Sequence, residues 1–252
     1  KCNTTGDCNI FLGSEAGGAA TVTGNDNIAV GRSAGASLTS GCNNVHIGCC
    51  AGKTSATGCC NVFIGVQAAS ATAVTGNNNL GLGYRAGNNL TSGYENVMLG
   101  KDSSLENTTG YRNVTIGLGA AQCMQTGCDN IALGYESLMG SSSVSSNTGD
   151  NNVAIGYYAG RGLSSGCYNN FIGFRAGQAI TTGCCNTLIG NYAGGALTTT
   201  SWNIMIGDCA GRCSTTTGAN NIYLGQGAGR CTSSNGADNT FLGYYAGYCN
   251  TS

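Results

Sequence analysis

The stretch Asn152-Val153-Ala154-Ile155-Gly156 decides the fold, because its pattern Asn-x-x-(Ile/Leu/Val)-Gly recurs along the whole chain of 252 residues. We use the glycine of this pattern as the anchor of a repeat and count positions in the repeat from it. Position −4 is Asn in all 14 repeats, position −1 is always Ile, Leu or Val, and position −7 is Gly in 13. The interval between neighbouring anchors is 17 or 18, except for one interval of 22, and the anchors are Gly13, Gly31, Gly48, Gly65, Gly83, Gly100, Gly117, Gly134, Gly156, Gly173, Gly190, Gly207, Gly225 and Gly243.

The length of this repeat predicts an all-β fold. A unit of this length is too short for a helical hairpin and lacks a helical period, so we expect each unit to form one coil of a β-solenoid. Coils then stack about 4.8 Å apart, with every column of the repeat lying on its own copies. The prediction is a single β-solenoid, of the β-roll or β-helix kind, with about 14 coils, a 17-residue repeat and no capping domain. We expect residues 1–252 to form one continuous solenoid, with an insertion loop at 139–148 between the coils anchored at Gly134 and Gly156.

The composition agrees with a stack of coils that are joined by tight turns. The chain has 44 Gly and no Pro, and only 8% of its residues are charged. We expect the glycines at the anchor and at position −7 to adopt positive φ angles, and Pro to be absent because every coil must donate its N–H groups. The net charge of −1 gives no electrostatic footprint for nucleic acid, and no apolar run is long enough to cross a membrane.

The asparagine column predicts an amide ladder, in which each side chain bonds its copy one coil away and caps turn backbone groups. Its members are Asn9, Asn27, Asn44, Asn61, Asn79, Asn96, Asn113, Asn130, Asn152, Asn169, Asn186, Asn203, Asn221 and Asn239.

The aliphatic positions −3 and −1 alternate with period two, so we expect both to point into the coil, facing the Ala or Ser at position +3. Position −2 is then expected to face outward, although it is apolar or aromatic in 11 of the 14 repeats. Two interpretations follow: this strand is buried on both faces within one chain, or position −2 forms a lateral interface between solenoids. The candidate interface residues are Phe11, Phe63, Met98, Phe171, Leu188, Met205, Tyr223 and Phe241, and His46 lies in the same column.

The first and last segments repeat the same phase, since Cys2 and Cys249 fall in one column. Two interpretations follow: the chain is cut from a longer array, or subunits stack head-to-tail into a fibre.

The 16 cysteines include several in matching columns of neighbouring coils, where stacked Cα atoms fall within disulfide range. The candidate disulfide cysteines are Cys2, Cys8, Cys42, Cys59, Cys123, Cys128, Cys167, Cys184, Cys213, Cys231 and Cys249. We expect doublets such as Cys49-Cys50 to send one thiol to each face. The alternative is that the thiols are buried and free, whereas disulfides imply an extracellular setting.

Sequons make the turn region a candidate for N-glycosylation, at Asn3, Asn89, Asn107 and Asn250. Asn113 also lies in a sequon, but we expect it to be bare because it belongs to the ladder.

Catalysis is not expected, because the carboxylates are scattered over different columns and the single His46 lies in an apolar one. We predict no catalytic residue, no metal site and no cofactor. Tyr, Phe and Arg gather just after the anchors, as in Tyr84-Arg85 and Phe174-Arg175, where they are suited to contact sugars or a neighbouring chain. A hydroxyl column at position −8 resembles the Thr rows of insect ice-binding β-solenoids, but here Thr precedes a turn glycine.

The strings Asn27-Ile28-Ala29-Val30-Gly31 and Asn152-Val153-Ala154-Ile155-Gly156 resemble the head repeat of YadA-like trimeric autotransporter adhesins, and similar repeats occur in phage and giant-virus fibres. The resemblance implies a trimer of parallel β-rolls that binds surfaces. The adhesin coils are shorter and lack Cys, so only the architecture and the lateral packing are carried over. We therefore expect a structural subunit of an extracellular fibre at a cell or virion surface. Its partner would be itself, and glycans are further candidate partners. The alternatives are a surface adhesin or receptor-binding shaft, and an ice-binding protein.

Overall fold

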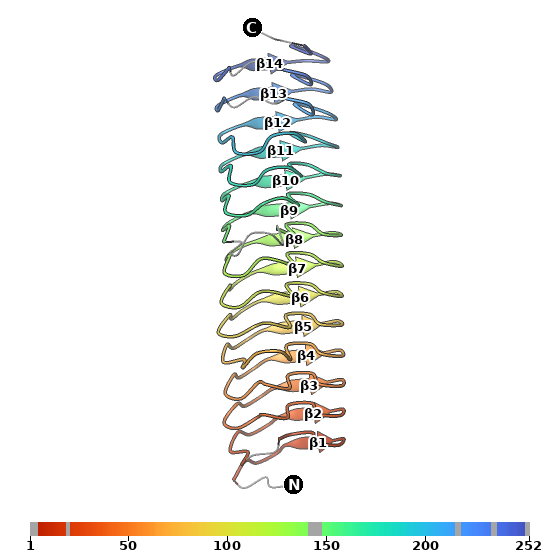
Figure 1. Cartoon of the computed structure of the whole chain (residues 1–252), viewed down its shortest axis with the longest axis vertical. Coiled ribbons are helices and arrows are strands. Elements are labelled where there is room, and N and C mark those ends of the chain that lie inside the picture. The colour runs from red at the N-terminus through yellow and green to blue at the C-terminus, as the bar shows by residue number, and fades with distance from the viewer. Residues whose placement is uncertain (1–4, 19–20, 141–147, 215–217, 233–235, 250–252) are drawn as a thin grey trace. The chain divides into compact units, whose positions relative to one another are not determined.

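The structure is a computed structural model that describes residues 5–18, 21–140, 148–214, 218–232 and 236–249. Strands are the regular elements within these ranges, and each spans positions −3 to −1 of one repeat (Figure 1). They are β1 (Ile10–Leu12), β2 (Ile28–Val30), β3 (Val45–Ile47), β4 (Val62–Ile64), β5 (Leu80–Leu82), β6 (Val97–Leu99), β7 (Val114–Ile116), β8 (Ile131–Leu133), β9 (Val153–Ile155), β10 (Asn170–Ile172), β11 (Thr187–Ile189), β12 (Ile204–Ile206), β13 (Ile222–Leu224) and β14 (Thr240–Leu242).

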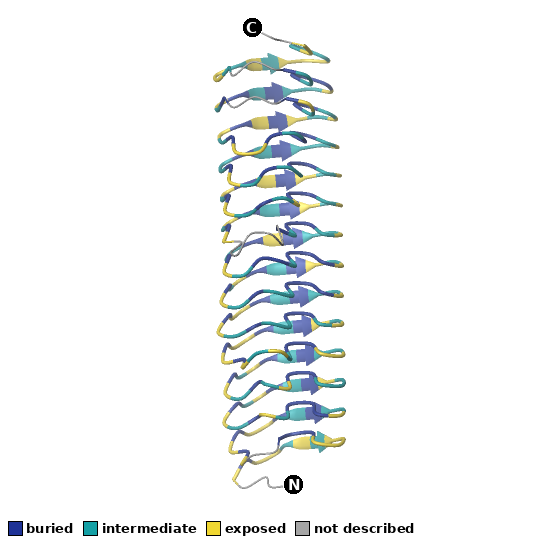
Figure 2. Ribbon diagram, viewed as in Figure 1, coloured by how far each residue is buried: buried dark blue, intermediate teal, exposed yellow. Residues whose placement is uncertain are grey.

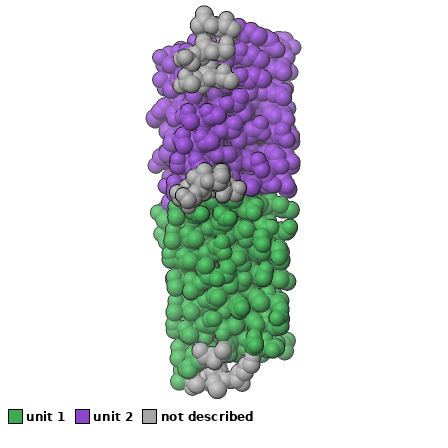
Figure 3. Space-filling view, in the orientation of Figure 1, with its two compact units in different colours: residues 1–127 green, residues 128–252 purple. Residues whose placement is uncertain are grey.

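The chain divides into two compact units, residues 1–127 and 128–252, which Figure 3 colours separately. In the first unit each strand from β1 to β6 pairs in parallel with the next one along the chain, so that the pairing within this unit ends at β7. In the second unit β8 to β14 pair in the same way. The predicted all-β solenoid, in which one repeat of the sequence forms one coil, is confirmed. That residues 1–252 form one continuous solenoid stays a prediction.

The strand register follows the repeat. Val45 lies opposite Val62, across an interval of 17, and Val62 lies opposite Leu80, across an interval of 18. Ile131 lies opposite Val153 in spite of the longer interval, so the insertion at 139–148 leaves the pairing of β8 with β9 intact. Residues 141–147 of that insertion lie outside the described residues.

Two kinds of glycine shape each coil. The anchor glycines have φ angles between 121° and 142°, as predicted, and a left-handed conformation recurs at positions −5, +2 and +4. The prediction of positive φ at position −7 is wrong, because no glycine of that column has a positive φ in the described part of the chain. Close approach explains this column instead, since a Cβ on Gly58 would lie 2.5 Å from the carbonyl oxygen of Gly76 in the next coil.

The core of a coil consists of few side chains. In the coil anchored at Gly173, Phe171 at position −2, Ala176 at +3 and Ile180 at +7 are all fully buried. The predicted inward direction of position +3 is confirmed. In Figure 2 the middle residue of most strands is buried, whereas the residues on either side of it are partly or fully exposed. The interior of each coil is therefore narrow, and the strand presents its other face to solvent.

Candidate assembly surface, cysteine pairs and aromatic row

The asparagine ladder is confirmed within each unit. The Asn169 Oδ1 accepts hydrogen bonds from the backbone N–H and the Nδ2–H of Asn186, both at 3.0 Å. Its Nδ2 donates to the Oδ1 of Asn152 at 3.0 Å and to the carbonyl oxygen of Gly183 at 2.8 Å. Equivalent backbone-to-Oδ1 bonds connect Asn9, Asn27, Asn44, Asn61, Asn79, Asn96 and Asn113 in the first unit. In the second unit they connect Asn130, Asn152, Asn169, Asn186, Asn203, Asn221 and Asn239. Each amide thus joins the strand of one coil to the turns of the next.

The strand faces are opposite to those predicted. The expected lateral interface lies in the core, because Phe63, Met98, Phe171, Leu188, Met205 and Tyr223 are fully buried and Phe11 and Phe241 are half-buried. The ladder explains the error: positions −4 and −2 have the same parity along a strand and therefore share a face. Because the asparagines at −4 point inward, the residues at −2 point inward with them.

His46 follows the same rule and is a core residue, not an interface residue. Its ring stacks on Phe63 with centroids 5.6 Å apart and an angle of 15° between the rings. Burial lowers the pKa of His46 to about 4, because charging an imidazole without solvent is unfavourable. The side chain is therefore neutral at physiological pH and packs as an aromatic ring.

The aliphatic residues at positions −3 and −1 are the ones that face solvent. In the second unit Ile155, Ile172 and Ile206 at position −1 are 37%, 36% and 39% exposed, and Ile204 at −3 is 39% exposed. We call the row of Ile, Leu and Val at position −1, together with the aliphatic residues at position −3, the aliphatic face; in the second unit position −3 also includes Asn170, Thr187 and Thr240. Contiguous apolar surface of this kind is uncommon on monomeric soluble proteins and marks sites of association.

Two predicted cysteine pairs are brought into contact. The sulfurs of Cys42 and Cys59 are 2.8 Å apart, and those of Cys167 and Cys184 are 3.0 Å apart. All four are free thiols in this structure, and a shift of less than about 1 Å would allow an S–S bond of about 2.05 Å. The hydrogen bond between Cys167 and Cys184 is the main cause that raises the pKa of Cys167 to about 11, and the bond between Cys42 and Cys59 likewise raises the pKa of Cys42. The sulfurs therefore lie where a disulfide would join successive coils.

The other predicted cysteine pairs have different outcomes in the structure. A hydrogen bond between Cys213 and Cys231 contributes to the raised pKa of Cys231, after burial, which is the larger cause. The predicted pairing of Cys8 with Cys2 cannot be placed, because Cys2 lies outside the described residues. The pairing of Cys123 with Cys128 stays a prediction, because these residues belong to different units. Cys249 is exposed.

The doublet Cys49-Cys50 does not send its thiols to opposite faces, because their sulfurs are 3.7 Å apart. The left-handed backbone at Cys50, with a φ of 59°, removes the strand-like alternation on which that prediction was based.

The glycosylation candidates are reduced in number. Asn107 is fully buried, and its Oδ1 accepts a hydrogen bond from the backbone N–H of Gly110 at 2.9 Å, so its side chain has no room for a glycan. Position +7, which it occupies, is a core column, and this was not visible in the sequon alone. Asn89 is half-buried, Asn113 is buried as expected for the ladder, and Asn3 and Asn250 lie outside the described residues.

Aromatic and arginine side chains form a surface row on the second unit. Tyr135 stacks on Tyr157 with centroids 5.1 Å apart, and Tyr157 stacks on Phe174 at 5.3 Å. The guanidinium of Arg175 lies 5.2 Å from the centroid of Phe174, within cation–π range. This row, which the sequence predicts, combines apolar rings with positive charge.

The structure also places the hydroxyl column and the residue types that commonly bind metals. The hydroxyl column at position −8 is exposed, but it lies in turns and not on strands, as at Thr57 and Thr182. Among the residues that the structure describes, no group of three or more His, Cys, Asp and Glu is placed to hold a metal ion. Within the same residues no helix has the length and hydropathy needed to cross a bilayer. Comparisons with family models, with curated proteins and with solved structures gave no match.

Proposed function

We propose that the protein is a structural subunit of an extracellular fibre, in which chains associate laterally through the aliphatic face. The carrying observation is the exposure of Ile, Leu and Val at position −1, in a column that is aliphatic in all 14 repeats. Burying these side chains against a second chain would remove apolar surface from water at roughly 25 cal/mol per Å². Because the row at position −1 is aliphatic at every coil, a second solenoid would find apolar contacts along the length of a unit.

Two further features support a fibre. The hydrogen bonds of the ladder are the same from coil to coil, so one coil is a template for the next, which suits head-to-tail stacking. The contacts between Cys42 and Cys59 and between Cys167 and Cys184 suit disulfides between coils. Such bonds are favoured outside the cell, which supports the extracellular setting.

Lateral association is tested with the triple variant Ile172→Thr, Ile189→Thr and Ile206→Thr in the second unit. Threonine keeps the β-branched shape that suits a strand but makes the face polar. We expect the native chain to sediment as a multichain species, with the trimer implied by the adhesin resemblance as one outcome. The triple variant should keep the circular dichroism spectrum and dissociate at concentrations at least tenfold higher than the native chain.

The matched control carries three substitutions on exposed turns, Ser165→Ala, Thr182→Ala and Thr199→Ala, and should assemble like the native chain. The proposal is wrong if the native chain is a single species of 25.2 kDa at every loading concentration. It is also wrong if the triple variant assembles as tightly as the control. Electron micrographs of the same samples would show whether the multichain species is a rod of defined width or a filament.

A further inference from the structure

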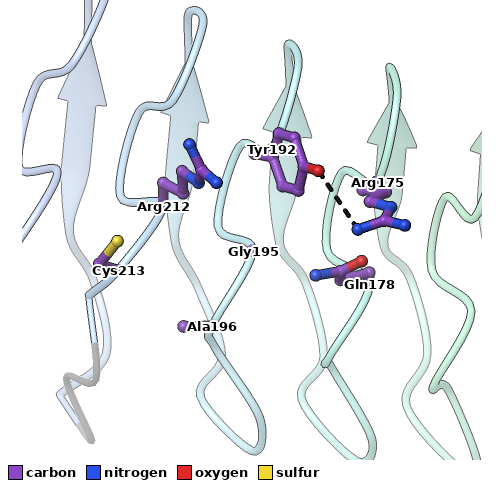
Figure 4. A pocket seen from close by; sticks show the side chains of 7 residues that line it. All are labelled: Arg175, Gln178, Tyr192, Gly195, Ala196, Arg212 and Cys213. Atoms are coloured by element: carbon purple, nitrogen blue, oxygen red, sulfur yellow. Dashed lines mark hydrogen bonds between the residues drawn. The ribbon is translucent and has the colours of Figure 1, made fainter.

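A surface cavity of about 490 Å³ opens on the second unit, in the coils that follow β10, β11 and β12. It exists because position +5 of the repeat changes size along the chain: Gln178, Gly195 and Arg212 occupy this position in three successive coils. Gly195 has no side chain, so a gap is left between the long side chains on either side of it, and Tyr192 lies beside this gap (Figure 4). In the second unit the other described residues at position +5 all carry long side chains, so the cavity lies where one side chain is missing from that column.

The charged side chains that line this cavity are all positive. Arg175 and Arg212 lie on either side of Tyr192, with their guanidinium carbons 5.6 Å and 4.3 Å from its ring centroid. The Nη1 of Arg175 donates to the tyrosine hydroxyl at 3.2 Å, while its Nε is buried without a hydrogen-bond partner. No carboxylate belongs to the lining, and within the described residues neither arginine forms an ion pair. Two positive charges therefore face one opening without a counter-charge.

A second cavity, on the first unit, shows that this is not a general property of the coil surface. It measures about 430 Å³, and its lining includes two cations, Arg85 and Lys53. The Nε of Arg85 lies 2.8 Å from Asp102 Oδ1, so its charge is already balanced. Lys53 forms no ion pair within the described residues, so one cation of this cavity is balanced and one is not, whereas both arginines of the cavity at Gly195 lack an ion pair.

The dimensions indicate the size of the ligand. A volume of about 490 Å³ falls within the range of about 300–1,000 Å³ of small-molecule sites, and is more than a small inorganic anion fills. Guanidinium groups bind carboxylates through paired hydrogen bonds, and the amide of Gln178 and the hydroxyl of Tyr192 suit the hydroxyl groups of a sugar. Gly195 has no side chain, which leaves space for a ring above its backbone.

We propose that this cavity binds an acidic saccharide, with its carboxylate attracted by the positive charges of Arg175 and Arg212 and its ring placed over Gly195. The inference goes beyond the fibre role and does not depend on it, because all lining residues belong to the second unit of one chain.

The test uses the full chain and two disaccharides that differ in one carboxylate, cellobiouronic acid and cellobiose, titrated by calorimetry at low salt. We expect cellobiouronic acid to bind at least tenfold more tightly than cellobiose. Sodium acetate and sodium sulfate form a third arm, and both should bind at least tenfold more weakly than cellobiouronic acid. Equal binding of the two disaccharides, or binding of neither, overturns the proposal. Binding of acetate as tight as that of the acidic disaccharide overturns its saccharide part.

Two variants locate the site. Gly195→Gln restores the side chain that Gln178 has in the preceding coil and should abolish binding by filling the gap. Gly195 has no positive φ, and a Cβ there would meet the backbone oxygen of Tyr192 at 3.2 Å, so small adjustments accommodate it. Arg85→Gln, in the cavity of the first unit, is the matched control and should bind like the native chain. Unchanged binding by Gly195→Gln would overturn the proposal. A chain that proves to be a monomer but binds the acidic disaccharide would refute the fibre and keep the site.

Discussion

Replacing Asn169 by Ala is the most direct test of the ladder. The side chain makes four hydrogen bonds to other residues, and it is fully buried. Two of its partners keep a bond after the substitution: Asn152 Oδ1 still accepts from the backbone N–H of residue 169, and Asn186 Nδ2 still donates to the carbonyl of Thr200. Two buried backbone groups, the carbonyl of Gly183 and the N–H of Asn186, lose the partner shown here.

The magnitude follows from these two groups. A buried polar group without a partner costs about 1–3 kcal/mol, so we expect Asn169→Ala to lower the free energy of unfolding by about 2–6 kcal/mol. Asn170→Ala is the matched control, because Asn170 occupies the adjacent exposed position of β10. A surface substitution of that kind changes stability by roughly 0.5 kcal/mol or less.

The assay combines urea unfolding with hydrogen exchange of the native chain. The amide of Asn186 should exchange faster in Asn169→Ala than in Asn170→Ala, because it has lost its acceptor, while amides several coils away should be little changed. If the two variants unfold at the same urea concentration and the Asn186 amide keeps its protection, the ladder is not a main source of stability and the reasoning is refuted.

Three further predictions concern individual side chains. Phe171→Ala should cost about 3–5 kcal/mol as a core truncation and Ile172→Ala roughly 1 kcal/mol or less in the same unfolding assay, and the reverse order would contradict the orientation of the strand. Because burial lowers the pKa of His46 to about 4 from 6.5, the folded chain loses stability as the pH falls from 6.5 towards 4, by about 2 kcal/mol at pH 5. His46→Phe should remove that part of the pH dependence, and unchanged curves would count against it. In oxidised protein a peptide map should find Cys42 joined to Cys59, with reduction costing about 3 kcal/mol for a loop of this length; alkylation of both sulfurs without a reductant would contradict this.

The fold could be predicted from the sequence because the repeat constrains it at every coil. The fixed spacing of the anchors determines that strands pair in parallel with register shifts of one repeat, and the structure has this pairing within each unit. It was harder to predict which face of the strand points into the core. The alternation of positions −3, −2 and −1 does not say whether position −2 or positions −3 and −1 lie inside. The residue that decides it is the asparagine at −4, and its parity with −2 was available in the sequence.

The candidate site was predictable only in part, for a related reason. Contacts between equivalent columns, such as Cys42 with Cys59, follow directly from the repeat length. The burial of Asn107 and the cavity at Gly195 depend instead on how a side chain fits among its neighbours in the coils before and after it. The residue types that are common at a repeat position do not reveal such local differences. The useful signal is a coil whose residue differs from its neighbours, such as Gly195 at position +5, where the coils before and after it have Gln178 and Arg212.

The composition of the aliphatic face argues for contact on that face beyond what strand formation requires. If position −1 only needed residues that favour strands, Thr would serve as well as Ile or Val, because its β-branched side chain fits a pleated surface equally well. Thr does occur at position −3, at Thr187 and Thr240, but never at −1. Position −1 instead includes Leu at Leu82, Leu99 and elsewhere, a residue that is not β-branched. What the column shares is therefore apolar character, which a surface left permanently in water would not require, and which a second chain packed along the strands would.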